Sequence, residues 1–313
     1  MIKKIVTMNQ QTFDLLILGS SSASPTAERH PTSQLLNIAE RYFLIDCGEA
    51  TQIQLRKYKA KLQAIDHILI SHLHGDHFFG LPGLLSTMSL LGRKQKLTIY
   101  CPEDLKLIID IINKASATVL NFEIVWRFTN NEGLNLLFED AKVEVYSFPL
   151  KHRIYCTGFL FKEKLLPRNV DKYKLEKLNI SVADILKLKK GLDVVNEDGK
   201  LIKNKEATIA PPLPRSYAYC SDTIFYKKIV PYIMDVNLVY HESTFLEDKK
   251  DRAKKTFHST AKQAAEIATL ANAKKLLLGH FSARYGNLSS FIAEATPIFE
   301  NCELALEGKV FKV

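Results

Sequence analysis

The sequence SHLHGDH occupies positions 71–77, between the apolar run HILI (67–70) and FFGLP (78–82). Four side chains of the kinds that bind metal ions fall within six positions: His72, His74, Asp76 and His77. On an extended or looping backbone, side chains two residues apart project the same way, so His72 and His74 can bind one cation while Asp76 and His77 turn towards a neighbouring one. Imidazole and carboxylate ligands without thiolates are typical of a catalytic Zn²⁺ centre. The spacing predicts half of a two-metal site, and the alternative is a surface loop that happens to be rich in histidine.

The motif HxHxDH is the signature of the metallo-β-lactamase fold. The longer stretch SHLHGDHFFGLPGLL (71–85) closely resembles the form found in ribonuclease Z, the endonuclease family that trims the 3′ end of precursor tRNA. The resemblance is to the short bacterial type and extends from Gly19 to Tyr285, with the motifs in family order. It implies an α/β fold, a four-layer αββα metallo-β-lactamase sandwich with an inserted basic arm, and it implies a homodimer.

Composition limits the classes that fit. The chain has 313 residues and no Pro/Gly/Ser-rich linker, so we expect a single domain over 1–313 in which residues 162–215 form the inserted arm. A net charge of +9 favours a polyanionic partner, although proteins that touch neither nucleic acid nor membrane also carry such an excess. Five scattered cysteines without a CxxC pair argue against a disulfide framework and favour a reducing cytoplasm. The sequence has no 18-residue apolar segment, so we predict no membrane span.

Strand and helix patterns place the motif at the end of a strand. Residues 34–38 and 42–46 look like a hairpin, residues 66–70 like the strand that delivers the motif, and residues 80–91 and 102–115 like helices. Asp46 ends its strand, where its carboxylate can accept from the second N–H of a ligand histidine or from the motif backbone, or can cap the next helix. The small residues at 19–25 (GSSSASP) form either a phosphate-holding loop or an ordinary turn.

Three further ligand candidates follow predicted strands. A lone histidine after a strand is more often structural than a ligand, but PLKHRIYCTGF (149–159), which contains His152, resembles the family's next metal motif. Asp222 resembles the family's bridging aspartate, since two carboxylate oxygens can hold cations roughly 3.5–4 Å apart, and its alternative role is a helix cap. His280 resembles the family ligand of the second metal. The resemblance thus implies two Zn²⁺ ions per subunit, the first bound by His72, His74, His152 and Asp222 and the second by Asp76, His77, His280 and Asp222.

The same resemblance implies catalytic roles. A hydroxide between the metals would attack phosphorus, and Asp76 would orient or deprotonate the water. HSTAKQAA (258–265) resembles the family's catalytic histidine motif, so His258 would protonate the leaving 3′ oxygen, unless it only packs or caps the helix that starts there. His241 and Glu242 lie in HESTF, close to the family's HEATF element, and are expected behind the metal ligands or on the substrate side. Arg284 and Tyr285 either help to place the scissile phosphate or anchor their loop.

The arm over 162–215 carries thirteen Lys or Arg against eight Asp or Glu. Leucine-spaced helical segments are expected at 170–190, with Lys187, Lys189 and Lys190 on the last of them. The resemblance implies that this arm clamps the tRNA body through its phosphates; the alternative is a solvated insertion. One departure stands out, because bacterial members typically carry a Gly/Pro-rich element where this chain has NISVADIL (179–186).

Together these features predict a zinc-dependent endoribonuclease. It would remove the 3′ trailer from precursor tRNA and leave a tRNA 3′-hydroxyl and a 5′-phosphorylated trailer. Two alternatives remain open at this point. One is a small-molecule phosphodiesterase or other hydrolase of the same fold, and the other is a non-catalytic RNA-binding module.

Overall fold

The computed structural model describes residues 11–170 and 178–313. Contacts between residues group the chain into two compact units. The larger unit comprises Thr12–Lys162 and Arg215–Val313, and the smaller includes Glu163–Pro214. Each unit has its own secondary structure and its own buried cluster.

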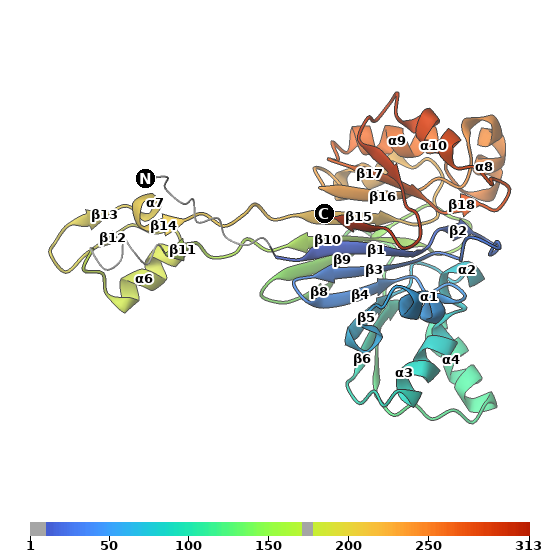
Figure 1. The fold of residues 1–313 in the computed structure, drawn as a ribbon, viewed down its shortest axis with the longest axis horizontal. Helices are drawn as coiled ribbons and strands as arrows, with labels where there is room; N and C mark the ends of the chain where they lie inside the picture. The colour runs from blue at the N-terminus through green and yellow to red at the C-terminus, as the bar shows by residue number, and fades with distance from the viewer. Residues whose placement is uncertain (1–10, 171–177) are drawn as a thin grey trace. The chain divides into compact units, whose positions relative to one another are not determined.

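The larger unit contains two seven-stranded sheets (Figure 1). The strands of the first sheet, in spatial order, are β20 (Val310–Lys312), β1 (Phe13–Gly19), β3 (Ser33–Ile38), β4 (Arg41–Ile45), β5 (Ile65–Leu69), β6 (Leu97–Cys101) and β7 (Ile124–Phe128). Those of the second are β19 (Cys302–Leu304), β17 (Leu276–Gly279), β16 (Leu238–Glu242), β15 (Ser216–Cys220), β10 (Thr157–Glu163), β9 (Val143–Pro149) and β8 (Asn135–Glu139). Strands β4 to β7 are parallel, as are β15, β16, β17 and β19. Parallel strands end at the same edge of their sheet, and that edge carries the functional loops.

Alternating side chains hold the two sheets together. On β15, Tyr217 and Tyr219 belong to the cluster between the sheets, while Ala218 and Cys220 belong to the cluster under the helices. The same period of two appears on β17, where Leu277 faces the first sheet. Both faces of these strands are therefore buried, which explains why they read as continuous apolar runs in the sequence.

Helices cover the outer face of each sheet, so the larger unit is a four-layer αββα sandwich (Figure 1). Beside the first sheet lie α1 (Thr51–Lys57), α2 (Gly75–Phe78), α3 (Leu81–Leu90) and α4 (Asp104–Ala115), with the 3-10 turn η1 (Leu62–Ala64). Beside the second lie α8 (Lys250–Thr256), α9 (Ala261–Leu270) and α10 (Ser289–Ala295), with η2 (Lys227–Tyr232) and η3 (Glu247–Lys249). The short strands β2 (Ser21–Ser22) and β18 (Phe281–Ser282) pair with each other.

The smaller unit consists of short elements. They are β11 (Asn169–Val170), α6 (Val182–Lys189), β12 (Val194–Val195), β13 (Leu201–Ile202), α7 (Asn204–Ala207) and β14 (Thr208–Ile209). Strand β11 pairs with β14 and β12 with β13. Its core is a cluster of four buried residues, Leu188, Val194, Ile202 and Ala207.

The predicted fold class is confirmed, and most strands and helices begin within two residues of the predicted positions. The helical prediction for 170–190 is wrong at its start, because Val170 lies in β11, and residues 171–177 fall outside the described residues. Asn179 has a φ of +46°, which an α-helix does not allow, and Ser181 then caps α6 by accepting the N–H of Asp184.

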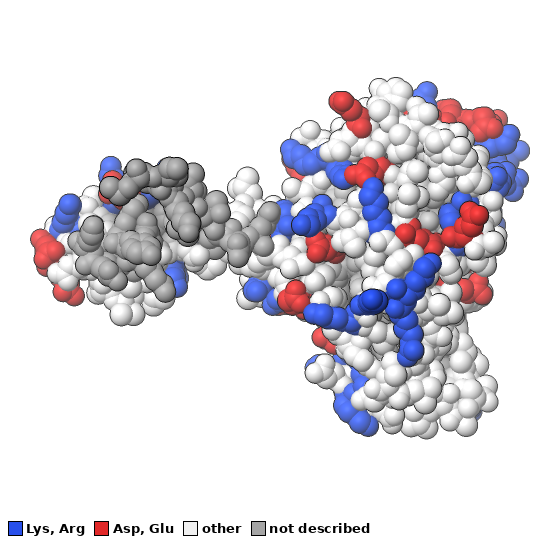
Figure 2. Space-filling view, in the orientation of Figure 1, with Lys and Arg blue, Asp and Glu red and all other residues white. Residues whose placement is uncertain are grey.

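All five cysteines are unpaired in the structure, as predicted. Within residues 11–170 and 178–313, no helix combines the length and the apolar character that a membrane crossing requires. Figure 2 shows acidic and basic side chains interspersed over the visible face of the larger unit, so the excess positive charge does not form one continuous field on that face.

Candidate active site

Loops that follow β5, β9, β15 and β17 bring the seven predicted ligands together. His72 and His74 follow β5. Asp76 and His77 lie in α2, a single helical turn that the prediction of an extended or looping backbone for the motif did not include. His152 follows β9, Asp222 follows β15 and His280 follows β17. The site therefore draws on both sheets.

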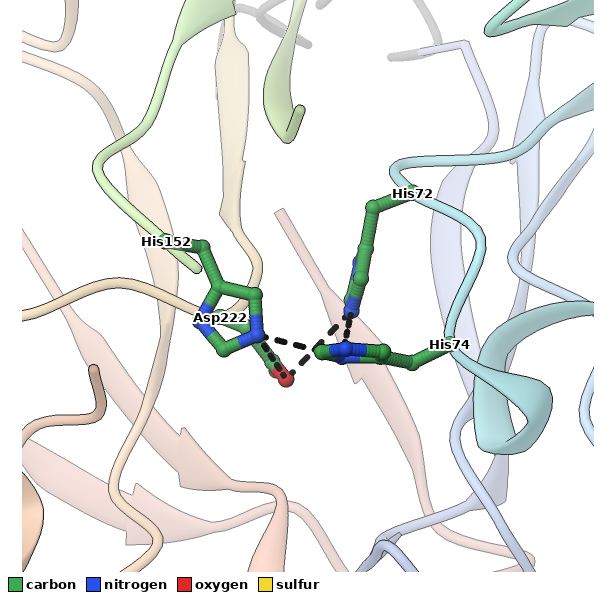
Figure 3. Close-up of side chains that lie close together, drawn as sticks. All are labelled: His72, His74, His152 and Asp222. Atoms are coloured by element: carbon green, nitrogen blue, oxygen red, sulfur yellow. Dashed lines mark hydrogen bonds and ion pairs between the residues drawn. The ribbon is translucent and has the colours of Figure 1, made fainter. Parts of the chain in front are cut away.

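The first donor set contains His72, His74, His152 and Asp222 (Figure 3). His74 Nδ1 lies 3.1 Å from His72 Nε2 and 3.1 Å from His152 Nε2. Asp222 Oδ2 lies 3.5 Å from His72 Nε2 and 3.7 Å from His152 Nε2. Three nitrogens and one oxygen at these separations can surround one cation in the tetrahedral manner that Zn²⁺ prefers.

The second donor set contains Asp76, His77 and His280. His280 Nε2 lies 3.3 Å from His77 Nε2 and 3.3 Å from Asp76 Oδ2. The other oxygen of Asp222, Oδ1, lies 3.2 Å from His280 Nε2 and 3.5 Å from His77 Nε2. One carboxylate thus offers an oxygen to each donor set.

The chemistry of these atoms fits a pair of metal ions. Asp222 Oδ1 is buried and accepts no hydrogen bond from any described residue, which is costly for a carboxylate oxygen without a cation beside it. Burial lowers the pKa of His72 to about 3 and lowers the pKa values of His74 and His152 below the ordinary value. These rings are therefore neutral at pH 7, the form in which imidazole nitrogens bind a metal cation.

Hydrogen bonds at the far ring nitrogens orient the ligands. His77 Nδ1 donates to Asp46 Oδ2 at 2.8 Å, and His152 Nδ1 donates to the carbonyl of Phe257 at 2.8 Å. His280 Nδ1 lies 2.9 Å from Thr244 Oγ1. Each contact leaves Nε2 free to face the centre of the site, as in metal sites whose ligand histidines are held by an outer partner.

Asp46 connects the motif to both sheets. It is fully buried and has a φ of +54°. Its Oδ1 accepts the N–H of Ser71 at 2.7 Å, and its Oδ2 accepts the hydroxyls of Ser71 at 2.9 Å and Tyr219 at 2.6 Å. These contacts are those expected of a carboxylate that fixes the ligand loop without binding the metal.

His258 stands beside the donor sets and is held by Glu242. Its Nδ1 lies 3.0 Å from Glu242 Oε1 and 3.9 Å from Asp222 Oδ2. Burial alone would lower the pKa of His258, but Glu242 and Asp222 together raise it to about 9. Glu242 also accepts the backbone N–H groups of Thr223, Thr244 and Ser259. The ring is therefore oriented by Nδ1, and Nε2 is the nitrogen left for a substrate.

An open cavity of about 490 Å³ gives access to these groups. Its lining includes His74, Asp76, His152, Asp222, His258 and His280. The rim adds the exposed ring of Phe79 and the small-residue loop at Ser22 and Ala23. The backbone N–H of Ala23 donates to Asp76 Oδ2 at 2.7 Å, so this loop holds a predicted ligand in place.

A family model described as anti-Pycsar protein Apyc1 matches residues 13–166. A ribonuclease Z from Cytophaga hutchinsonii is 50% identical over 302 residues, which cover 96% of this chain and 96% of that protein. The chain belongs to the ribonuclease Z family.

Solved structures agree with this assignment. The short form of human tRNase Z has 29% identity and a TM-score of 0.70 over 96% of this chain and 99% of its own. A metallo-β-lactamase fold protein from Bacillus subtilis, at 17% identity and a TM-score of 0.68, shares the fold over 97% of this chain and 100% of its own. As a ribonuclease Z family member with two His/Asp donor sets, the chain is a divalent-metal-dependent hydrolase of the metallo-β-lactamase superfamily.

Some predicted residues lie apart from the ribonuclease Z metal site. His241 is fully buried, and its Nδ1 donates to the carbonyl of Glu242 at 2.7 Å, while its Nε2 meets no hydrogen-bond partner among the described residues. It belongs to none of the candidate metal groups found in the described part of the chain. Alternation along β16 turns His241 away from Glu242, towards the helices.

Arg284 and Tyr285 contact their own surroundings. Arg284 is exposed, donates from Nε to Ser282 Oγ at 3.0 Å and lies over the ring of Phe245 at 5.2 Å. The Tyr285 hydroxyl accepts the N–H of Leu246 at 3.2 Å, and its carbonyl accepts from Arg29 at 2.9 Å. Neither residue lines the active-site cavity, so these contacts favour the interpretation that Arg284 and Tyr285 anchor their loop.

The three arm lysines lie at the end of α6. Lys187 pairs with Asp184 at 2.9 Å, and its side chain is 58% exposed. Lys189 and Lys190 are exposed and line a cavity of about 530 Å³ within the smaller unit, together with Arg168 and Pro211. This cavity is lined by both cationic and apolar side chains.

Three elements of this family's site were not anticipated from the sequence. They are the Thr244 hydroxyl behind His280, the contact of Ala23 with Asp76, and helix α8 with the turn at Phe257. Phe257 has a φ of +59°, and the N–H of the next residue, His258, donates to the carbonyl of Ala253 at 2.8 Å. A Lys/Arg-rich segment gives little apolar signal for a helix, but its basic last turn before a residue with positive φ is a recognisable helix end.

Proposed function

We propose that this chain removes the 3′ trailer from precursor tRNA. It would leave a tRNA 3′-hydroxyl and a 5′-phosphorylated trailer. The observation that carries the hydrolytic chemistry is Asp222, one oxygen of which lies with each donor set. The substrate class follows from membership of the ribonuclease Z family over almost the full length of the chain.

The proposed cofactor is two Zn²⁺ ions per chain, one in each donor set. Nitrogen and carboxylate oxygen donors without thiolates support zinc. Bound there, the ions would lower the pKa of a shared water and offset the negative charge that builds up around phosphorus. Metal analysis of protein purified without added metal is expected to give close to two zinc ions per chain.

Side chains of the protein supply the remaining steps. Asp76 lines the cavity and is held by the Ala23 N–H, so its carboxylate can orient the attacking water. His258 lines the cavity, and because Glu242 holds its Nδ1, its Nε2 can give a proton to the departing 3′ oxygen. The 2′-hydroxyl need not take part, because the nucleophile comes from water.

The inserted arm over 162–215 is proposed to hold the tRNA body. Its exposed Lys189 and Lys190 flank a cavity with Arg168, a grouping suited to phosphates rather than to bases. Affinity for a folded RNA would then fall steeply with salt and depend little on sequence. The arm is also what separates this proposal from a small-molecule hydrolase with the same catalytic centre.

The proposed assembly is a homodimer in the cytoplasm. Support for a second copy comes from α4, which exposes Leu107 at 60% and Ile111 at 57% on one face, at a spacing of four residues. Five unpaired cysteines are compatible with a reducing compartment. Light scattering after size-exclusion chromatography is expected to give twice the chain mass, and a monomer would contradict the assembly.

The test of function uses one end-labelled precursor tRNA with a 3′ trailer. Cleavage directly after the acceptor stem, abolished by chelator and restored by Zn²⁺, is expected. A tRNA product with a 2′,3′-cyclic phosphate would refute the mechanism, since it requires attack by the 2′-hydroxyl. Retained binding without cleavage would favour the non-catalytic RNA-binding alternative, and hydrolysis of small phosphodiesters alone would favour the small-molecule alternative.

A further inference from the structure

The imidazole of His258 forms part of the wall of two cavities. One is the active-site cavity of about 490 Å³, and the other is a cavity of about 320 Å³. The second cavity is lined by Ile224, Phe225, Lys250, Asp251, Lys254, His258 and Gln263. It lies in the same unit as the metal ligands and contains none of them. A substrate in contact with His258 can therefore extend from one cavity into the other.

The second cavity has an apolar wall and a basic wall. Ile224 and Phe225 come from the loop that follows Asp222, and both are half-buried. The basic wall is α8, whose seven residues, KDRAKKT, contain four cations and one carboxylate. Lys227 Nζ lies over the Phe225 ring, 5.3 Å from its centroid, so this ring already stands beside a cation. An aromatic ring with lysines nearby is the arrangement with which proteins hold an unpaired nucleotide, its base on the ring and its phosphate on a cation.

The lysines of the basic wall are not equivalent. Lys250 already pairs with Glu247 at 2.6 Å. Lys254 is exposed, and within the described residues its ammonium group has no ion-pair or hydrogen-bond partner. Asp251 is the acidic residue of this lining and reduces its net charge. Lys254 is therefore the cation available to a phosphate that enters the cavity.

The polarity of the reaction decides which nucleotide lies here. When the scissile bond breaks, the departing oxygen is O3′ of the nucleotide on the 5′ side, which is the last nucleotide of the tRNA body. A proton donor must approach that oxygen within about 3 Å in the reacting complex. The ribose of the last tRNA nucleotide therefore lies against His258, whereas the trailer begins on the other side of the phosphorus.

We infer that the cavity between Phe225 and α8 binds the unpaired 3′-terminal nucleotide of the tRNA body, with its base against Phe225 and its 5′ phosphate beside Lys254. This inference rests on the proposed function and adds the direction in which the RNA crosses the site. The trailer then begins on the side of the scissile phosphorus away from this cavity.

The phosphate contact is tested with Lys254→Ala and a matched control, Lys255→Ala. Lys255 lies on the same helix, carries the same charge and lines neither of the two cavities. Lys254→Ala is expected to raise KM for precursor tRNA roughly fivefold, to change kcat less, and to reduce the slope of log KM against log salt by about one phosphate equivalent. The control variant is expected to retain the wild-type slope. Equal slopes for both variants would overturn the phosphate contact.

The base contact is tested on the unaltered protein with two abasic precursor tRNAs. In one, the last nucleotide of the tRNA body lacks its base, and in the other, the first trailer nucleotide lacks its base. Loss of a stacked base is expected to lower kcat/KM roughly tenfold for the first substrate and to have little effect for the second. The opposite pattern would mean that the trailer occupies this cavity and would overturn the inference.

Phe225→Leu ties the effect to the aromatic ring. Leucine keeps the contact with the core under the second sheet but removes the stacking face. The penalty for the abasic tRNA nucleotide is expected to shrink at least threefold in this variant, and an unchanged penalty would place the base elsewhere. Failure of the proposed function is distinct from both results, because the unaltered protein would then not cleave the complete precursor tRNA.

Discussion

The two units of the molecule differ in how much apolar core they bury. The larger unit has three buried clusters, and the metal-facing groups His72, His77, Asp222 and His280 are at most 2% exposed. The smaller unit is built around four buried apolar side chains, and its lysines at the end of α6 are exposed. Chemistry at phosphorus requires donor atoms to be fixed within fractions of an ångström, whereas attraction of phosphates requires only that charges be present. In the function proposed above, catalysis would depend on the unit with the larger core and binding of the tRNA body on the small insertion.

Asp222→Asn is expected to have the largest effect. One oxygen becomes an amide nitrogen that cannot bind a cation, so one donor set loses a ligand and several kcal/mol of transition-state stabilisation disappear. Cleavage of precursor tRNA is expected to fall by roughly 1,000-fold or more, and the zinc content by about one ion per chain. The control is Asp248→Asn, which also removes one negative charge but at an exposed position. It is expected to leave the cleavage rate and the zinc content unchanged. Normal zinc content with full activity in Asp222→Asn would remove the bridging role.

His258→Ala is expected to separate metal binding from proton transfer. Loss of a general acid costs about 100- to 1,000-fold in kcat. Zinc content is expected to be retained, and a substrate whose leaving group needs no proton, such as bis(p-nitrophenyl) phosphate, is expected to lose much less. Zinc lost from this variant would instead assign His258 to the metal site, as its place in a third group with Asp222 and His280 would allow.

Deletion of residues 164–205 separates the contribution of the arm from that of the larger unit. The kcat/KM for precursor tRNA is expected to fall roughly 10- to 100-fold and to lose most of its salt dependence, because phosphate contacts are removed. Hydrolysis of bis(p-nitrophenyl) phosphate is expected to continue at the rate of the full chain. Unchanged cleavage of precursor tRNA by the deletion variant would show that the arm is not the tRNA-binding element.

A pair of core substitutions gives the smallest expected change in activity. Leu277→Ala, between the sheets, is expected to lower the free energy of unfolding of the larger unit by about 2–5 kcal/mol. Leu188→Ala, in the arm core, is expected to leave the melting temperature of that unit unchanged and to raise KM for precursor tRNA a few-fold. Thermal unfolding monitored by circular dichroism, together with steady-state kinetics, measures both. A large fall in the main melting transition for Leu188→Ala would show that the two units unfold together.

The sandwich could be predicted because its signals are local. Buried parallel strands appear as apolar runs, and candidate ligands follow several of them, as His72 follows β5 and Asp222 follows β15. The arm could not be predicted to the same extent. Leucines at helical spacing suggested a helix from residue 170, but Val170 pairs with Thr208 in a two-stranded ribbon, and this partner lies far along the chain. The sequence of neither segment has a periodic pattern that would reveal its pairing with a distant partner.

In the site, the ligand positions could be predicted, and the contacts that hold them could not. The helical turn α2 has only four residues and depends on tertiary contacts, since the N–H of Cys47 donates to the carbonyl of His77 at 2.7 Å. No local pattern encodes such a contact. The role of Ala23 was equally hidden, because a backbone N–H carries no residue identity.

Because the candidate ligands come from loops of both sheets, the unfolded chain contains only fragments of each donor set. Zinc bound by the native state alone would raise the free energy of unfolding by about 2.7 kcal/mol when free metal exceeds its dissociation constant a hundredfold. The melting temperature of the protein would then rise with the concentration of free zinc. A cell short of zinc would lose this protein through unfolding and proteolysis as well as through inactivity.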